Sequence, residues 1–162
     1  MVVVDSSALI PLARVGRLDR IPAVSDEIWT MSHVLDEVMT EGKRGSAALS
    51  SFFETVSVRE PPGDADKIAT LEGIAAADAG FVLLADERKS ILLANDKGLI
   101  EVARSHGVEC WWVTTLLLES AKNGDLTGPA AADVLYELVE AGMNMSPKVY
   151  SQVQRRLQEF DA

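Results

Sequence analysis

Residues 90–97 read Ser-Ile-Leu-Leu-Ala-Asn-Asp-Lys, a short apolar run that ends abruptly in polar and charged residues. Because helix-like segments flank this run on both sides, it predicts a buried parallel strand. Asp96 then leaves the sheet at the C-terminal edge of the strand, where ligands bind in open α/β sheets. The N-terminus repeats the pattern, since Val2, Val3 and Val4 are followed by Asp5. The sequence therefore predicts two strands that each end in a carboxylate.

Apolar runs and helix-period segments alternate through the first 113 residues. Strands are predicted at 2–4, 28–31, 56–58, around Ile91 and at 109–113, and helices at 6–14, 33–41, 46–53, 65–71, 74–86 and 98–106. Ser6 and Ser7 are the expected caps of the first helix, and 65–71 can continue into 74–86 across Gly73. Three more helices are predicted at 114–123, 129–141 and 147–158. This alternation is typical of an α/β fold, a three-layer sandwich with a parallel sheet between helices. We expect one domain over 1–162, with a core at 1–113 and a helical C-terminal extension at 114–162.

The composition indicates a protein of the reducing cytosol. Cys110 is the only cysteine, so no internal disulfide can form, and no Cys/His spacing suggests zinc. The first residues lack the basic segment of a secretion signal, and no uncharged stretch approaches the ~18 residues of a membrane span. We expect a soluble cytoplasmic protein without membrane contact.

The formal net charge is -10, from 25 acidic and 15 basic residues. Such a charge disfavours non-specific binding to a polyanion, so a nucleic-acid substrate has to be held locally. Bound divalent cations would reverse the potential where they lie. A role in solubility alone explains the total charge equally well.

A third acid, Asp78, falls inside an apolar stripe. It lies four residues after Ile74 and three before Phe81, at helical spacing. An unpaired buried carboxylate costs many kcal/mol. Asp78 therefore either needs a partner or lies on the surface of its helix.

The fourth acid cannot be chosen by periodicity. In the helix predicted at 33–41, the apolar residues leave Asp36 and Glu37 equally far from the centre of the stripe. Either residue can flank a site, and either can be a solvated surface acid.

Four segments together resemble the PIN domain, the small metal-dependent nuclease fold of VapC-like toxins and related ribonucleases. They are Val2-Val3-Val4-Asp5-Ser6-Ser7, Val34-Leu35-Asp36-Glu37-Val38, Asp78-Ala79 with its apolar helix, and Ile91 to Asp96. The family's second acid precedes the final Val, which selects Glu37 over Asp36. The resemblance covers about 1–113. The tail, through Thr115-Leu116-Leu117 and Gly142-Met143-Asn144-Met145-Ser146, resembles a subgroup of small stand-alone PIN proteins.

The resemblance implies a metal-dependent endoribonuclease that hydrolyses RNA phosphodiester bonds as the toxin of a toxin–antitoxin pair. Asp5, Glu37, Asp78 and Asp96 would be catalytic residues and ligands of Mg²⁺ or Mn²⁺, with Ser6 or Ser7 orienting Asp5. Hard divalent cations take oxygen ligands, activate water and stabilise a departing oxygen. A homodimer and an antitoxin segment over the acidic cleft are also implied.

Three basic residues are candidate contacts for substrate phosphates. Lys43 and Arg44 lie in a glycine-flanked loop after the Glu37 helix, although a solvated loop explains them as well. Lys97 directly follows Asp96, so its ammonium can also take part of the place of a cation.

Two histidines and two tryptophans are predicted to have structural roles. His33 and His106 lie near helix ends and are expected to be structural or surface residues. Trp111 and Trp112 point to opposite faces of the strand predicted at 109–113, so one can fill the core while the other meets a helix layer or a partner.

Two other functions fit part of the pattern. A PIN-like module that binds nucleic acid or protein without turnover is favoured by Lys97 and by the acidic surface. A phospho-transfer domain also places an Asp at a strand end. However, a haloacid-dehalogenase-like protein needs a second Asp where Ser7 stands, and a receiver needs paired N-terminal acids. Phospho-transfer therefore ranks last.

Overall fold

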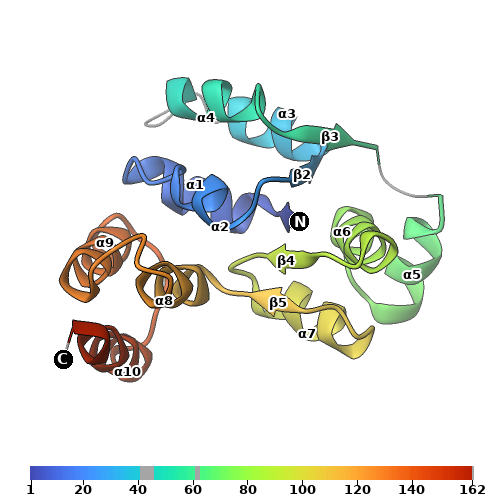
Figure 1. Cartoon of the computed structure of the whole chain (residues 1–162). Helices are drawn as coiled ribbons and strands as arrows, with labels where there is room; N and C mark the ends of the chain where they lie inside the picture. The colour runs from blue at the N-terminus through green and yellow to red at the C-terminus, as the bar shows by residue number, and fades with distance from the viewer. Residues whose placement is uncertain (41–45, 61–62, 162) are drawn as a thin grey trace.

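The computed structural model describes residues 1–40, 46–60 and 63–161. Within these residues one sheet is formed by β1 (Val2–Val4), β2 (Ile28–Met31), β3 (Ser57–Arg59), β4 (Ile91–Leu93) and β5 (Cys110–Trp111). The strand order is β3-β2-β1-β4-β5, and each neighbouring pair is parallel. Figure 1 shows α1 and α2 on one side of the strands and α5 and α6 on the other. The predicted α/β fold with a parallel sheet is confirmed.

Helices make up most of the remaining chain. They are α1 (Ser6–Arg14), α2 (Arg20–Val24), α3 (Ser32–Thr40), α4 (Ser46–Phe53), α5 (Ala65–Glu72), α6 (Ala76–Arg88), α7 (Lys97–Ser105), α8 (Val113–Lys122), α9 (Gly128–Glu140) and α10 (Pro147–Gln158), followed by a 3-10 turn at Glu159–Asp161. The helix α6 packs on β1, β2 and β4, while α8 packs on α2 and α9 on α1. Figure 1 shows α8, α9 and α10 gathered at the end of the molecule that carries the C-terminus.

The strand order places a topological switch point between β1 and β4. The chain runs outward from β1 to β2 and β3, and then returns to the other side of β1 as β4. Val2, Val3 and Val4 pair in register with Ile91, Leu92 and Leu93, so the two strands end level with each other. Directly beyond them the Asp5 N–H donates to the Leu93 carbonyl at 3.0 Å. In open α/β sheets, ligands bind in the crevice that such a switch point creates.

The first helix is capped by Asp5, so the predicted cap at Ser6 or Ser7 is wrong. The Asp5 Oδ2 atom accepts a hydrogen bond from the Ser7 N–H at 3.3 Å. Aspartate caps a helix as well as serine does. Because Asp5 directly follows β1, the helix begins as soon as the strand ends.

The strand β5 is shorter than the predicted strand at 109–113. It ends at Trp111, and Trp112 is the N-cap of α8. Only Trp111 belongs to the strand, so the predicted alternation of the two side chains between opposite faces of one strand does not apply. Both tryptophans lie partly buried against the core.

The alternative of one continuous helix across Gly73 is also wrong. Gly73 ends α5 with φ +68°, a left-handed conformation that glycine adopts without a Cβ clash. The helical segments Ala65–Leu71 and Ala76–Arg88 meet at 114°. No single helix within the described ranges is long and apolar enough to span a membrane, and only this bent pair reaches the required length and composition.

We expect Gly73→Ala to lower the free energy of unfolding by about 1 kcal/mol, because alanine is strained in the left-handed region. Chemical denaturation measures the change. Gly63→Ala is the matched control, since a Cβ at either glycine meets nothing within 4 Å and only Gly73 of the two has a positive φ. Equal losses in the two variants would contradict the prediction.

Candidate active site

Two acids lie where a strand passes into a helix. Asp5 follows β1 and caps α1, while Asp96 follows β4 and caps α7, where its Oδ1 accepts from the Leu99 N–H at 3.1 Å. A helix N-terminus carries partial positive charge, which stabilises a carboxylate placed there. Asp5 is buried and Asp96 is exposed. The same local design therefore fixes both acids at the switch point.

Ser7 connects Asp5 to the strand that leads to Asp96. Its Oγ donates to the Asp5 Oδ2 at 2.6 Å and accepts from the Asn95 N–H at 2.8 Å. A hydroxyl group can do both at once. Of the two serines expected to orient Asp5, Ser7 is the one hydrogen-bonded to it, while Ser6 is buried and lines the same cleft.

All four predicted acids line one cleft with a volume of about 410 Å³. Glu37 reaches it from α3 and Asp78 from the first turn of α6. Asp36, the alternative to Glu37, is not among the lining residues. No Lys or Arg of the described chain lines the cleft. The fold thus gathers acids from distant parts of the sequence, and the described lining holds no Lys or Arg beside them.

The charges in the cleft act on Asp78. Partial burial, followed by the charges of Asp5, Asp96 and Glu37 in that order of importance, raises the pKa of Asp78 from 3.8 to about 6. Both causes disfavour the ionised form. The four carboxyl groups are therefore close enough to interact electrostatically.

The carboxyl oxygens are not gathered at one point. Among the side chains that the structure describes, no three His, Cys, Asp or Glu residues are placed so that they could hold one metal ion. Two carboxylates 4 Å apart repel by about 4 kcal/mol at an effective dielectric near 20, so they favour separated positions. Mg²⁺ usually keeps several waters and binds proteins through one or two carboxylates. The donor set fits such an ion, with the remaining acids reaching it through water.

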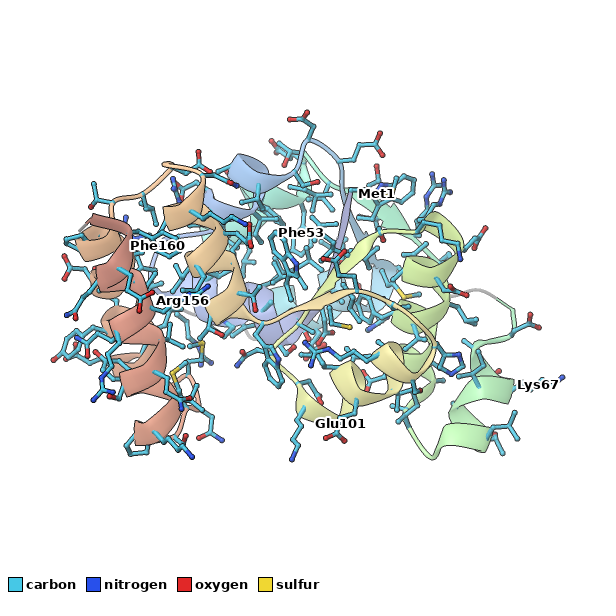
Figure 2. The ribbon with its side chains drawn as sticks, turned by 60° about the horizontal axis from the view of Figure 1, so that its bottom comes forward. Met1, Phe53, Lys67, Glu101, Arg156 and Phe160 are labelled. Carbon is cyan, nitrogen blue, oxygen red and sulfur yellow. The ribbon has the colours of Figure 1, made fainter. Side chains whose placement is uncertain are left out.

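Lys97, one of the three predicted phosphate contacts, is not among the residues that line the cleft. The Lys97 Nζ lies 3.8 Å from the Glu101 Oε1, and the two side chains are 81% and 66% exposed. Figure 2 shows Glu101 on the outer side of α7. Lys97 therefore does not take the place of a cation beside Asp96. Lys43 and Arg44 lie outside the described residues.

His33 lines the cleft, which sequence reasoning missed. Its ring packs edge-to-face on Phe81 with the centroids 5.4 Å apart, and its Nδ1 is buried without a hydrogen-bond partner. His33 precedes Glu37 by four residues on α3, and residues at this spacing share one face of a helix. That spacing is the signal that could have placed His33 beside the acids. His106 lies exposed at the C-cap of α7, as expected.

Comparison with known families decides the assignment. The model of the family DUF3368, described as a PIN domain, matches residues 1–159. This chain belongs to the PIN domain family. The crystal structure of PAE2754 from Pyrobaculum aerophilum has a similar fold, with a TM-score of 0.59 and 22% identity, over 75% of this chain and 96% of that chain. A comparison with curated proteins finds no match.

Membership of the PIN domain family indicates the general chemistry of the cleft. PIN domains are usually metal-dependent nucleases, typically bind divalent metals and act on nucleic acids. The resemblance drawn from the four acidic segments is thereby confirmed at the level of the family.

Asp78→Asn should stabilise the metal-free PIN domain at neutral pH. The native pKa near 6 lies above the ordinary 3.8, so between about pH 4 and 6 the native state holds a proton that the unfolded state has released. Above pH 6 the native state has to carry the charge in the cleft. The associated stability is present below about pH 4 and is lost as pH rises through 6. We expect the thermal midpoint in EDTA to rise by about 2–4 °C at pH 7.5 and to stay unchanged near pH 4. Asp133→Asn, at an exposed position on α9, is the control, and an equal rise in that variant would contradict this origin.

Ser7→Ala removes two hydrogen bonds, so the Asp5 carboxylate and the Asn95 N–H each lose a partner. We expect the free energy of unfolding to fall by about 1–3 kcal/mol, as measured by urea denaturation. Ser6→Ala is the matched control at the neighbouring buried position. If both variants lose the same stability, the bridge through Ser7 has no special role.

Proposed function

We propose that this PIN domain protein is an endoribonuclease that depends on Mg²⁺ or Mn²⁺. The observation that carries the proposal is the meeting of Asp5, Glu37, Asp78 and Asp96 in one cleft at the switch point of the sheet. Carboxylates and water form an oxygen-only donor set, which hard divalent cations prefer. The cleft is therefore suited to metal-assisted hydrolysis of a phosphodiester.

The four acids have different parts in this proposal. Asp5 and Asp96 are held by hydrogen bonds from Ser7 and from the Leu99 N–H, so they would be the direct ligands. Glu37 and Asp78 reach the cleft from helices and would hold the ion directly or through its water. When bound, the ion activates water for in-line attack and stabilises the departing oxygen.

Electrostatics makes substrate binding depend on the metal. The chain carries a net charge of -10, and the described cleft lining contains four acids and no Lys or Arg. A phosphate group is therefore repelled from this cleft unless cations neutralise it. Cation binding and RNA binding are expected to be coupled, since each lowers the electrostatic cost of the other.

The choice of RNA and of a biological role rests on the resemblance of the four acidic segments to VapC-like toxins and related ribonucleases, to which the tail adds a resemblance to small stand-alone PIN proteins. On this basis the proposal includes the toxin part of a toxin–antitoxin pair. A homodimer and an antitoxin segment that covers the acidic cleft belong to the same proposal.

A binding module without turnover is the second candidate. It is favoured by the separated positions of the acids, since no three of the described side chains are placed to hold one ion together. In that case RNA or a protein would bind at the cleft and leave unchanged.

Single-stranded RNA, incubated with the full chain and Mg²⁺ or Mn²⁺, discriminates between the two candidates. We expect internal cleavage that EDTA abolishes and that Asp5→Asn and Asp96→Asn each reduce more than about 100-fold, because loss of a metal ligand exceeds the 10–100-fold effect of an outer-shell partner. Asp133→Asn on α9 makes the same chemical change outside the cleft and should keep full activity. Metal-dependent cleavage that survives both cleft substitutions would contradict the site, and no cleavage of any RNA would favour the binding module.

A further inference from the structure

A second pocket lies beside the acidic cleft. It has a volume of about 340 Å³ and is lined by residues that follow β4 and β5 and by the start of α10. From the strand ends come Asn95, Trp112 and Thr114, and from the α10 side come Asn144, Met145 and Val149. The tail segment that contains Asn144 and Met145 thus has a defined place in the fold.

The pocket and the cleft are lined by consecutive residues of the chain. Asn95 lines the pocket, and the next residue, Asp96, lines the cleft. The Asn95 N–H also donates to the Ser7 Oγ, which in turn holds Asp5. A molecule whose phosphate lies in the cleft can therefore place its neighbouring group in the pocket.

The chemistry of the pocket differs from that of the cleft. Its described lining contains no charged residue, while the cleft contains four acids. Trp112 is partly buried against the core, and Thr115 Oγ1 accepts from its N–H at 3.3 Å, so its backbone position is fixed. Asn95 and Asn144 add amide groups that can both donate and accept hydrogen bonds.

The uncharged lining, the tryptophan and the amide groups make the pocket complementary to a nucleobase. Single-stranded RNA is recognised by aromatic side chains that stack on unpaired bases and by polar groups that bond the base edges. A pocket of this size is at the lower end of the range for small ligands, which suits one planar ring. A phosphate or a charged peptide would find no charge complement there.

We propose that this pocket binds the base of the nucleotide next to the scissile phosphate, with Trp112 as the stacking surface and Asn144 as a contact to the base edge. This proposal rests on the proposed ribonuclease function, and it names single-stranded RNA with a splayed base as the substrate class. Trp112, Asn95 and Asn144 are binding residues in this scheme, and the acids of the cleft remain the catalytic ones.

Mononucleotides test the pocket without cleavage, because they contain no phosphodiester bond. Calorimetric titration of the full chain with Mn²⁺ compares the four ribonucleoside 5′-monophosphates with ribose 5-phosphate, which lacks the base. We expect at least one nucleotide to bind about tenfold more tightly than ribose 5-phosphate, the order of magnitude of base stacking on an aromatic residue. Trp112→Leu and Asn144→Ala should each reduce this gain, while the affinity for ribose 5-phosphate stays unchanged.

Trp111→Leu is the matched control for Trp112→Leu. Trp111 precedes Trp112 and is also partly buried, but it does not line the pocket, so its substitution should keep the gain. Trp112→Phe keeps an aromatic ring and should retain most of it. Asn144 is exposed, so its substitution tests the pocket even if Trp112→Leu fails to fold.

Two results would contradict the proposed binding of a base in this pocket. One is equal affinity for ribose 5-phosphate and all four nucleotides, and the other is a gain that Trp112→Leu and Asn144→Ala leave unchanged. RNA cleavage without a base-dependent gain in affinity would support the ribonuclease function and contradict base binding in the pocket. A base-dependent gain in a protein that cleaves no RNA supports the pocket and contradicts the ribonuclease.

Discussion

This site depends on one constraint, the repulsion between carboxylates. Separate strands and helices bring these carboxylates to one edge of the sheet. Asp78 shows the combined effect of burial, the larger cause, and of this repulsion. As a first-turn residue of α6 it gains from the helix dipole, which contributes about 0.3–1 kcal/mol. Its pKa nevertheless rises from 3.8 to about 6, so the net effect on the charged form is in the opposite direction. Burial and three neighbouring negative charges therefore outweigh the dipole.

The sheet holds the acids together against this repulsion. Val3 and Val4 on β1 and Leu92 and Leu93 on β4 are all fully buried, so the two strands cannot move apart without exposing the core. Hydrogen bonds from Ser7 and from the Leu99 N–H then fix the acids that follow these strands. Crowding of like charges lowers the free energy of unfolding. Such locally unfavourable arrangements are common at functional sites. A divalent cation is the ligand that would relieve this crowding.

The sequence predicted more about the positions of the acids along the chain than about their surroundings. The two strand-end acids follow from apolar runs that stop at Asp5 and Asp96, because carboxyl ends of parallel strands share one edge. Periodicity left Asp36 and Glu37 equivalent, since neighbouring residues flank an apolar stripe symmetrically, and the family resemblance was needed to choose Glu37. The predicted cap of α1 was wrong, and the continuation of the helix across Gly73 was left open, because strand endings and left-handed glycines depend on the path of the whole chain.

By itself the sequence determined the alternation of strands and helices and the acids that end β1 and β4, because both depend on local patterns of apolar and polar residues. Only the tertiary structure decided that β4 pairs with β1, that Glu37 and Asp78 reach the same cleft, and that Trp112 and Asn144 share a pocket. These are contacts between residues far apart in the chain. Their distances are set by the packing of the entire core, which no short segment of sequence contains.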